Sequence, residues 1–150
     1  MFKEIAVPIP LKVWQDPQGN PFLVDSEHRT VVYLRCWTDD CEPADFACEI
    51  SFQHGWASRM THIEFSPYKI NDPHRSAIYE VVNSSWLKEA TKRRKKCYPR
   101  WKSWDKNVYH HYVIEGHDCY LEVLAENFTE KTIPLETVKG ILPLFHQDFL

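Results

Sequence analysis

One short segment in the second half of the chain combines positive charge with aromatic rings. Nine of the eighteen lysines and arginines lie between Lys88 and Lys106 with two acids among them, so the segment has a net charge of +7 and the rest of the chain has −10. Like charges packed this closely raise the energy unless solvent, salt or an anionic surface offsets them. The segment therefore predicts a contact surface for an acidic partner.

The side chains of this segment suit contact with anions and with unpaired bases. Guanidinium and ammonium groups pair with phosphates or carboxylates, and large rings stack on bases. The residues predicted to bind a partner are Arg93, Arg94, Lys96, Arg100, Trp101, Lys102 and Trp104. Because the whole chain has a net charge of −3, we expect an acidic protein or a second copy of the chain, and nucleic acid is the less favoured partner.

The same segment also has a purely structural interpretation. Cations near the last turn of a helix are stabilised by the partial negative charge of the helix end, and their long stems cover apolar surface. On this interpretation the segment is a solvated helix end followed by an exposed loop.

A second set of residues has the chemistry of metal ligands and of acids and bases. His110, His111, His117, Asp118 and Glu122 lie within one predicted hairpin. Two imidazoles and a carboxylate can form an open metal site or an oriented general base. His110 and His111 face opposite sides of a strand, so both cannot bind one ion without distortion. The alternative function is thus a small metal-dependent enzyme or hydrolase that uses His110, His117 and Glu122.

The common signatures of enzymes are missing from the chain. It contains no Gly-rich phosphate loop, no G-x-S-x-G motif and no H-E-x-x-H motif. We therefore predict no catalytic residue and no cofactor, and the leading expectation is a noncatalytic binding protein.

Cysteine usage and hydropathy bear on the compartment. The five cysteines include no C-x-x-C pair, and a chain of this size needs no disulfides to fold, so we expect reduced thiols. The apolar runs are too short to span a bilayer. These patterns predict a cytoplasmic protein without a membrane partner.

The elements that position these residues follow from apolar periodicity. Asp72 and Pro73 are typical of a helix start, and the apolar residues from Ile78 to Ala90 recur at three- and four-residue steps. These features predict one long middle helix over residues 73–94.

The remaining patterns predict strands. Alternation over 46–53 and 59–65 around a His54-Gly55 turn indicates one hairpin, and residues 11–15 and 21–24 indicate another around a proline and glycine turn. Residues 109–115 and 119–125 indicate a third hairpin. Residues 30–37, apolar on both faces, are typical of a central strand. A short helix is expected after Pro134.

Part of the second half resembles other proteins. Residues 62–126 contain FSPYKIND at 65–72, NSSWL at 83–87 and an aromatic hairpin that ends in EVLA at 122–125. This pattern resembles small bacterial proteins of unknown function. The resemblance implies a bacterial cytosolic source and brings no catalytic residue with it.

Together these elements predict the fold class. We expect a single α+β domain over residues 1–150, in which an antiparallel sheet of about six to eight strands packs against the long middle helix.

Overall fold

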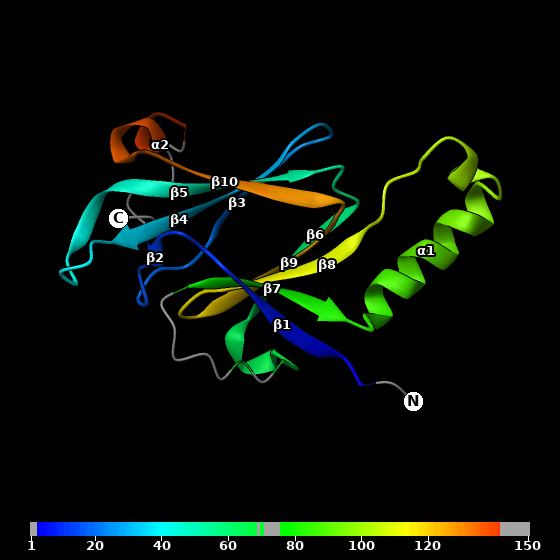
Figure 1. Cartoon of the computed structure of the whole chain (residues 1–150), viewed down its shortest axis with the longest axis horizontal. Helices are drawn as coiled ribbons and strands as arrows, with labels where there is room; N and C mark the ends of the chain where they lie inside the picture. Colours follow the sequence, from blue (N-terminus) through cyan, green and yellow to red (C-terminus); the bar gives the residue numbers. More distant parts are fainter. Residues whose placement is uncertain (1–2, 69, 71–75, 142–150) are drawn as a thin grey trace.

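The computed structural model describes residues 3–68, 70 and 76–141. Within these ranges the chain forms two antiparallel sheets (Figure 1). Sheet A has the order β1-β7-β8-β9-β6, with bounds Ile5–Pro10, Ala77–Val82, His110–Glu115, Cys119–Ala125 and Ala57–His62. Sheet B has the order β10-β5-β4-β2, with β3 also paired to β4; the bounds are Asn127–Pro134, Pro43–Gln53, Thr30–Trp37, Trp14–Gln15 and Phe22–Asp25.

Helices are a minor part of the described chain. They are α1 (Ser85–Cys97), α2 (Leu135–Ile141) and two single 3₁₀ turns, η1 (Ile63–Phe65) and η2 (Trp101–Ser103). The protein is therefore mostly β, and the predicted α+β class with a long middle helix is wrong.

The main core lies between the two sheets. Sheet B contributes Val32, Leu34 and Ile50, and sheet A contributes Ile114 and Leu121, each with at most 1% of its surface exposed. Alternation along each strand directs these side chains inward, which is how two twisted antiparallel sheets bury a shared face.

The outer faces of both sheets are also partly covered. On sheet B, Val138 of α2 packs against Val31, Tyr33 and Ala47. Strand β4 is thus buried on both sides and paired on both edges, so the predicted central strand at 30–37 is confirmed. On sheet A, Tyr68 packs against a second outer cluster.

The predicted helix over 73–94 is wrong in its first half. Residues 77–82 form β7, and Ile78, Tyr79 and Val81 are all buried because both faces of sheet A are covered here. A strand buried on both faces has no two-residue alternation, so its apolar spacing does not distinguish it from a helix. Asn83 then turns the chain with a φ of 60°, and α1 begins at Ser85. The predicted start at 72–73 lies outside the described residues.

The predicted hairpin between 46–53 and 59–65 is also wrong. Strand β5 pairs with β4 and β10, whereas β6 pairs with β9. His54, with a φ of 52°, and Gly55 carry the chain from sheet B to sheet A. A turn between two alternating strands looks the same in sequence whether the strands pair or separate, because both arrangements bury one face of each strand.

The other two predicted hairpins have opposite outcomes. Residues 11–15 and 21–24 do not pair with each other, since β2 and β3 both pair with β4. Strands β8 and β9 do form the third hairpin, with the Gly116 N–H bonded to the Cys119 carbonyl at 2.7 Å. The short helix after Pro134 is present as α2.

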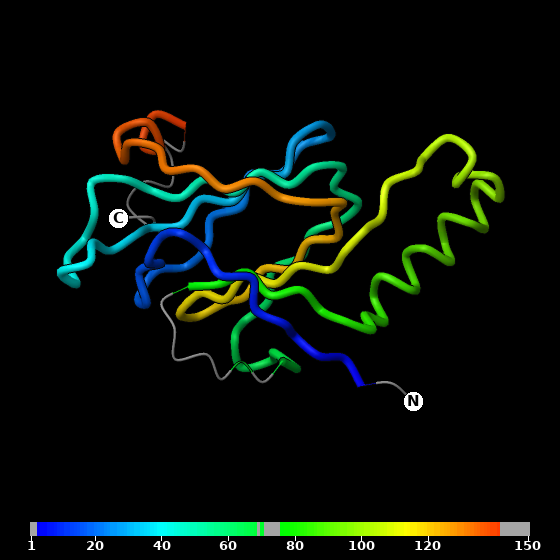
Figure 2. The backbone as a smooth tube through the Cα atoms, in the orientation of Figure 1, coloured from blue at the N-terminus to red at the C-terminus, as the bar shows by residue number. Residues whose placement is uncertain are grey.

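The overall arrangement places α1 by itself. Figure 1 shows α1 projecting beside the sheets at one end of the long axis, while α2 and the β4–β5 turn lie at the other. Figure 2 shows the chain returning from the far end of α1 through residues 98–109 to β8. The segment with the charge excess thus forms one protruding unit.

Candidate functional site

The helix α1 carries the cationic segment and is fixed at both of its ends. At its N-terminus the Ser84 hydroxyl accepts a hydrogen bond from the Leu87 N–H at 3.0 Å, which caps the helix. Glu4 accepts bonds from the Ser85 N–H at 2.6 Å and the Ser85 hydroxyl at 2.8 Å. A carboxylate at this position complements the positive end of the helix dipole.

Near its C-terminus α1 is anchored by Arg94. The guanidinium carbon lies 4.7 Å from the ring centroid of Trp56, 4.8 Å from that of Trp101 and 5.0 Å from that of Trp104. A guanidinium over aromatic faces is stabilised by the ring quadrupoles. Arg94 also pairs with Asp105 at 2.9 Å, and only 20% of its side chain is exposed. This cation therefore serves the fold.

Asp105 completes the anchor. Its carboxylate accepts hydrogen bonds from the Tyr109 hydroxyl at 2.6 Å and the Asn107 N–H at 3.0 Å. Burial opposes ionisation, but these hydrogen bonds and the charge of Arg94 lower the pKa of Asp105. The carboxylate stays charged and holds the 98–109 loop against α1.

Sequence reasoning missed Trp56 in this cluster. Its ring stacks on Tyr109 with centroids 3.7 Å apart and meets Trp101 edge to face at 5.7 Å. Trp56 is far from these residues in the chain, and its position depends on the crossing at Gly55 from one sheet to the other. A single tryptophan after a glycine does not by itself predict these contacts.

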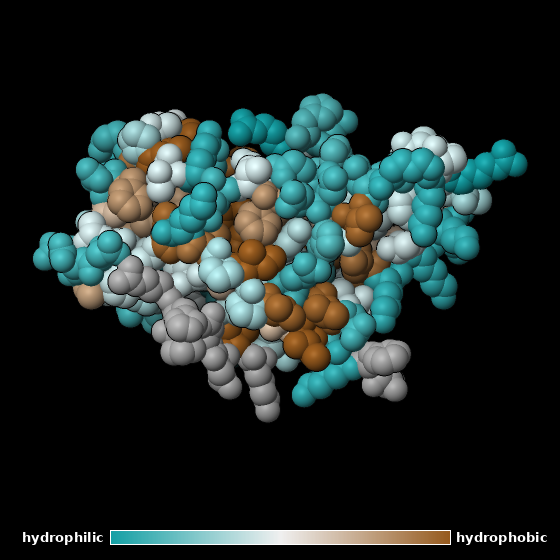
Figure 3. Space-filling view, in the orientation of Figure 1, coloured by the Kyte–Doolittle hydropathy of each residue, from teal (hydrophilic) through white to brown (hydrophobic). Residues whose placement is uncertain are grey.

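The other cations of the segment are exposed. Figure 3 shows hydrophilic side chains gathered along α1 on the face in view. The exposed cations are Lys88, Lys92, Arg93, Lys95, Lys96, Arg100, Lys102 and Lys106. Among them Arg93 pairs with Glu89 one turn away at 2.7 Å, a solvent-exposed contact worth little.

Two aromatic rings of the segment are exposed beside these cations. Tyr98 and Trp104 have 61% and 62% of their surface exposed and meet edge to face at 6.3 Å. They line a shallow groove of about 760 Å³ between the C-terminal end of α1, the 104–109 loop and the crossing at residues 54–56. We call these two rings and the exposed cations the cationic aromatic surface.

The structure thus divides the residues predicted to bind a partner. Arg93, Lys96, Arg100, Lys102 and Trp104 lie on the cationic aromatic surface. Trp101 is 5% exposed and Arg94 is enclosed by rings, so these two support the surface from beneath.

A buried polar network lies between α1 and sheet A. His111 contacts the Ser84 hydroxyl through Nδ1 at 2.7 Å and the Glu122 carboxylate through Nε2 at 2.8 Å. Glu122 also accepts from Arg59, directly opposite on β6, and from the Tyr68 hydroxyl at 2.8 Å. Burial alone would raise the pKa of Glu122, but the hydrogen bonds from His111, Arg59 and Tyr68 lower it to about 2.

This network has the order of groups found in a serine hydrolase, hydroxyl to imidazole to carboxylate. Its nucleophile is inaccessible, because Ser84 is 4% exposed and His111 is fully buried. The Ser84 oxygen is also occupied as the helix cap, and the neighbouring Ser85 N–H is bonded to Glu4. The network therefore fastens α1 to sheet A.

The histidines proposed as metal ligands do not meet. His110 pairs in register with Ala125 and Val113 with Glu122, so His110 and Glu122 point to opposite faces of sheet A. His110 contacts Glu80 at 2.9 Å, and His117 lies in the β8–β9 turn beside Asp118. In the described part of the chain no group of three or more His, Cys, Asp or Glu side chains could hold a metal ion.

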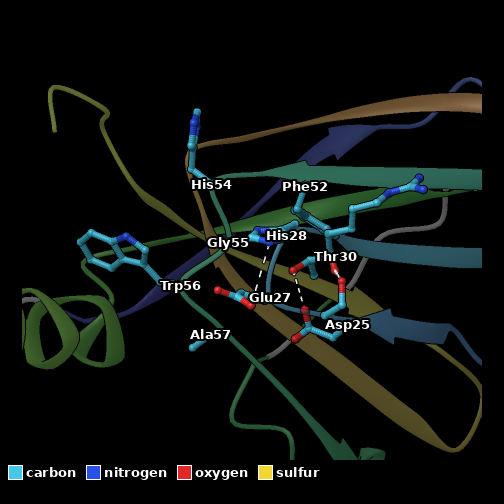
Figure 4. A pocket seen from close by; sticks show the side chains of 11 residues that line it. Asp25, Glu27, His28, Thr30, Phe52, His54, Gly55, Trp56 and Ala57 are labelled. Carbon is cyan, nitrogen blue, oxygen red and sulfur yellow. Dashed lines mark hydrogen bonds and ion pairs between the residues drawn. The ribbon is translucent and has the colours of Figure 1, made fainter.

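A separate polar pocket of about 440 Å³ lies on the other side of Trp56, between the β3–β4 turn and the crossing at Gly55. Figure 4 shows the Trp56 indole directed away from Asp25 and Thr30. The Asp25 carboxylate is bonded by the hydroxyls of Thr30 at 2.8 Å and Ser58 at 2.6 Å. These bonds use the Asp25 carboxylate, and the second acid of the pocket, Glu27, is exposed and lies 4.0 Å from His28.

No protein family, curated protein or solved structure matches this chain. The resemblance of residues 62–126 to small bacterial proteins stays a prediction. Among the helices of the described residues, none has the length and apolar character needed to cross a membrane.

Proposed function

We propose that this chain is a noncatalytic binding protein that contacts an acidic partner through the cationic aromatic surface. The observation that carries the proposal is the separation of roles within the segment. Arg94 and Asp105 neutralise each other inside the anchor, while the other cations face solvent with Glu89 as their sole acidic neighbour on α1. A fold that needed only a stable helix end would not need so many unpaired charges there.

The geometry of the helix also supports a contact role. The helix carries lysines at positions 88, 92, 95 and 96. They follow one another mostly at steps of three or four residues, so their side chains lie on neighbouring faces of α1. Arg100, Lys102 and Lys106 extend the charge around the loop to the groove. A partner that bridges helix and loop would neutralise the repulsion among these groups.

A cytosolic location is part of the proposal. All five cysteines are free, including the exposed Cys41 and Cys97. Free thiols are typical of a reducing compartment.

Heparin, a polyanion that has neither bases nor peptide groups, tests the proposal. We expect Lys95→Gln, Lys96→Gln and Arg100→Gln together to weaken heparin affinity on the order of 10- to 100-fold at low salt, because each exposed cation releases counterions on binding. The control combines Lys12→Gln, Arg29→Gln and Lys139→Gln, which removes the same charge from exposed or half-exposed sites elsewhere.

The measurement is titration calorimetry at two salt concentrations. The control variant should keep affinity within about twofold of the natural sequence, since its cations lie outside the contact. Equal losses in both triple variants would mean that net charge alone governs binding, and the proposed surface would be abandoned. If the natural sequence did not bind heparin at low salt, the proposed surface would also be abandoned.

A further inference from the structure

The exposed rings of the cationic aromatic surface are held in a fixed arrangement. Trp104 follows the η2 turn, and its N–H is bonded to the Trp101 carbonyl at 3.2 Å. Trp101 is buried, and the Arg94 guanidinium lies 5.0 Å from the Trp104 centroid. The Trp104 ring is therefore fixed from beneath and still 62% exposed.

Tyr98 is the second exposed ring that lines the groove. Its ring is nearly perpendicular to that of Trp104, with an interplanar angle of 83°. Two exposed rings that meet nearly at a right angle can present one flat face and one edge to a ligand. Because the two rings already contact each other and Trp104 also contacts Arg94, we expect a flat ligand that stacks there to cost little additional side-chain entropy of the protein.

Exposed cations lie in the groove beside these rings and in the turn between them. Lys106 lines the groove together with Tyr98 and Trp104, and Arg100 and Lys102 occupy the turn that joins the two rings. Alternation of flat rings with cations along a groove is the pattern by which proteins hold single strands, with bases stacked and phosphates paired.

Other anionic partners would contact only the cations of this surface and not its rings. An acidic peptide neutralises the cations but brings no flat ring for Trp104. A duplex keeps its bases paired and hidden, and the net charge of −10 outside the segment repels a long rigid polyanion. A flexible strand can follow the cations and turn its bases to the rings.

We propose that the ligand of the cationic aromatic surface is single-stranded nucleic acid, with at least one base stacked on Trp104. This inference rests on the proposed binding function and specifies its partner. Sequence preference is weak on this account, because every base has a face that can stack.

The test compares a thymidine oligonucleotide of roughly 12 nucleotides with an abasic strand of the same length, a duplex and poly-L-glutamate. Binding is followed by tryptophan fluorescence quenching and by anisotropy. We expect the thymidine strand to bind at least about 10-fold tighter than the abasic strand, since stacking adds to the phosphate contacts. The duplex and poly-L-glutamate should bind more weakly than the thymidine strand.

Substitutions locate the stacking. Trp104→Ala should weaken binding of the thymidine strand roughly 5- to 100-fold and leave the abasic strand nearly unchanged. Val108→Ala is the control, because Val108 is 69% exposed on the same loop but lies outside the groove. Melting temperatures of both variants establish that they fold.

The outcomes distinguish the single-strand inference from the proposed binding of an acidic partner. Equal binding of thymidine and abasic strands, or tighter binding of poly-L-glutamate or duplex, would overturn the single-strand inference and leave the anionic-partner proposal intact. Loss of affinity for heparin and for every strand would overturn both. An equal effect of Trp104→Ala and Val108→Ala would also overturn the inference.

Discussion

Arg94 and Glu122 are candidate functional residues in the sequence, but the fold gives both of them structural roles. From the sequence, Arg94 is one of a run of cations and Glu122 is one of a set of metal ligands. In the structure, rings and Asp105 enclose Arg94, while Arg59, His111 and Tyr68 enclose Glu122. Neither role follows from residue type, because each depends on partners that the fold brings together from other parts of the chain.

The network around Glu122 predicts a specific dependence of stability on pH. Its folded-state pKa of about 2 lies below the ordinary value of 4.5. The group therefore stabilises the fold fully above about pH 5, and this contribution, on the order of 3 kcal/mol, is lost as the pH falls toward 2. Glu122→Gln should destabilise the protein at pH 7, and the difference from the natural sequence should shrink as the pH falls below 4.5.

Urea unfolding between pH 7 and pH 2.5 measures this difference. Glu136→Gln on α2 is the matched control, because the Glu136 side chain is 83% exposed and its removal should not change the pH dependence. A constant gap between the natural sequence and Glu122→Gln across this range would show that the carboxylate is not held by the network.

At the scale of elements, a turn of sheet B and a turn of sheet A contact each other and connect the two sheets. The 16–20 turn docks on the β8–β9 turn, with the His117 N–H bonded to the Gly19 carbonyl at 3.0 Å and the Asp118 N–H bonded to Asn20 at 2.8 Å. A Cβ on Gly116 would lie 2.5 Å from Pro21. The absence of a side chain there lets the two turns approach each other.

Gly116→Ala should therefore destabilise the fold by roughly 1–3 kcal/mol, because the added methyl group forces the turns apart. Gly140→Ala is the contrasting change, since a Cβ at Gly140 meets nothing within 4 Å and alanine favours the helix. Thermal unfolding of both variants compares them. Equal stabilities would show that the contact between the turns contributes nothing.

The same scale explains which elements sequence reasoning could predict. The β8–β9 hairpin and β4 were predictable because a local turn or a continuous apolar run defines them. The β5–β6 hairpin and the first half of the middle helix failed because pairing across two sheets overrode the local patterns at Gly55 and Ile78. For the site, the charge excess was readable from the sequence, but the burial of Trp101 and the anchor at Trp56 depend on contacts that the sequence does not show.

At the scale of the whole molecule, charge is separated along the long axis. The cationic aromatic surface lies at one end, and the β4–β5 turn with exposed Asp39, Asp40 and Glu42, followed by exposed Asp45 in β5, lies at the other (Figure 1). Such a field orients an anionic ligand toward α1 and disfavours contact elsewhere. Binding is therefore expected at one place, with a strong dependence on salt.

The most direct test of the central claim is the NMR footprint of a bound polyanion. Heparin added to ¹⁵N-labelled protein should shift the amide and indole signals of residues 88–106 and leave those of 39–45 and of β1 in place. The shifts should disappear as salt is raised, because counterion release drives the contact. Shifts spread evenly over both sheets, or centred away from α1, would contradict the account.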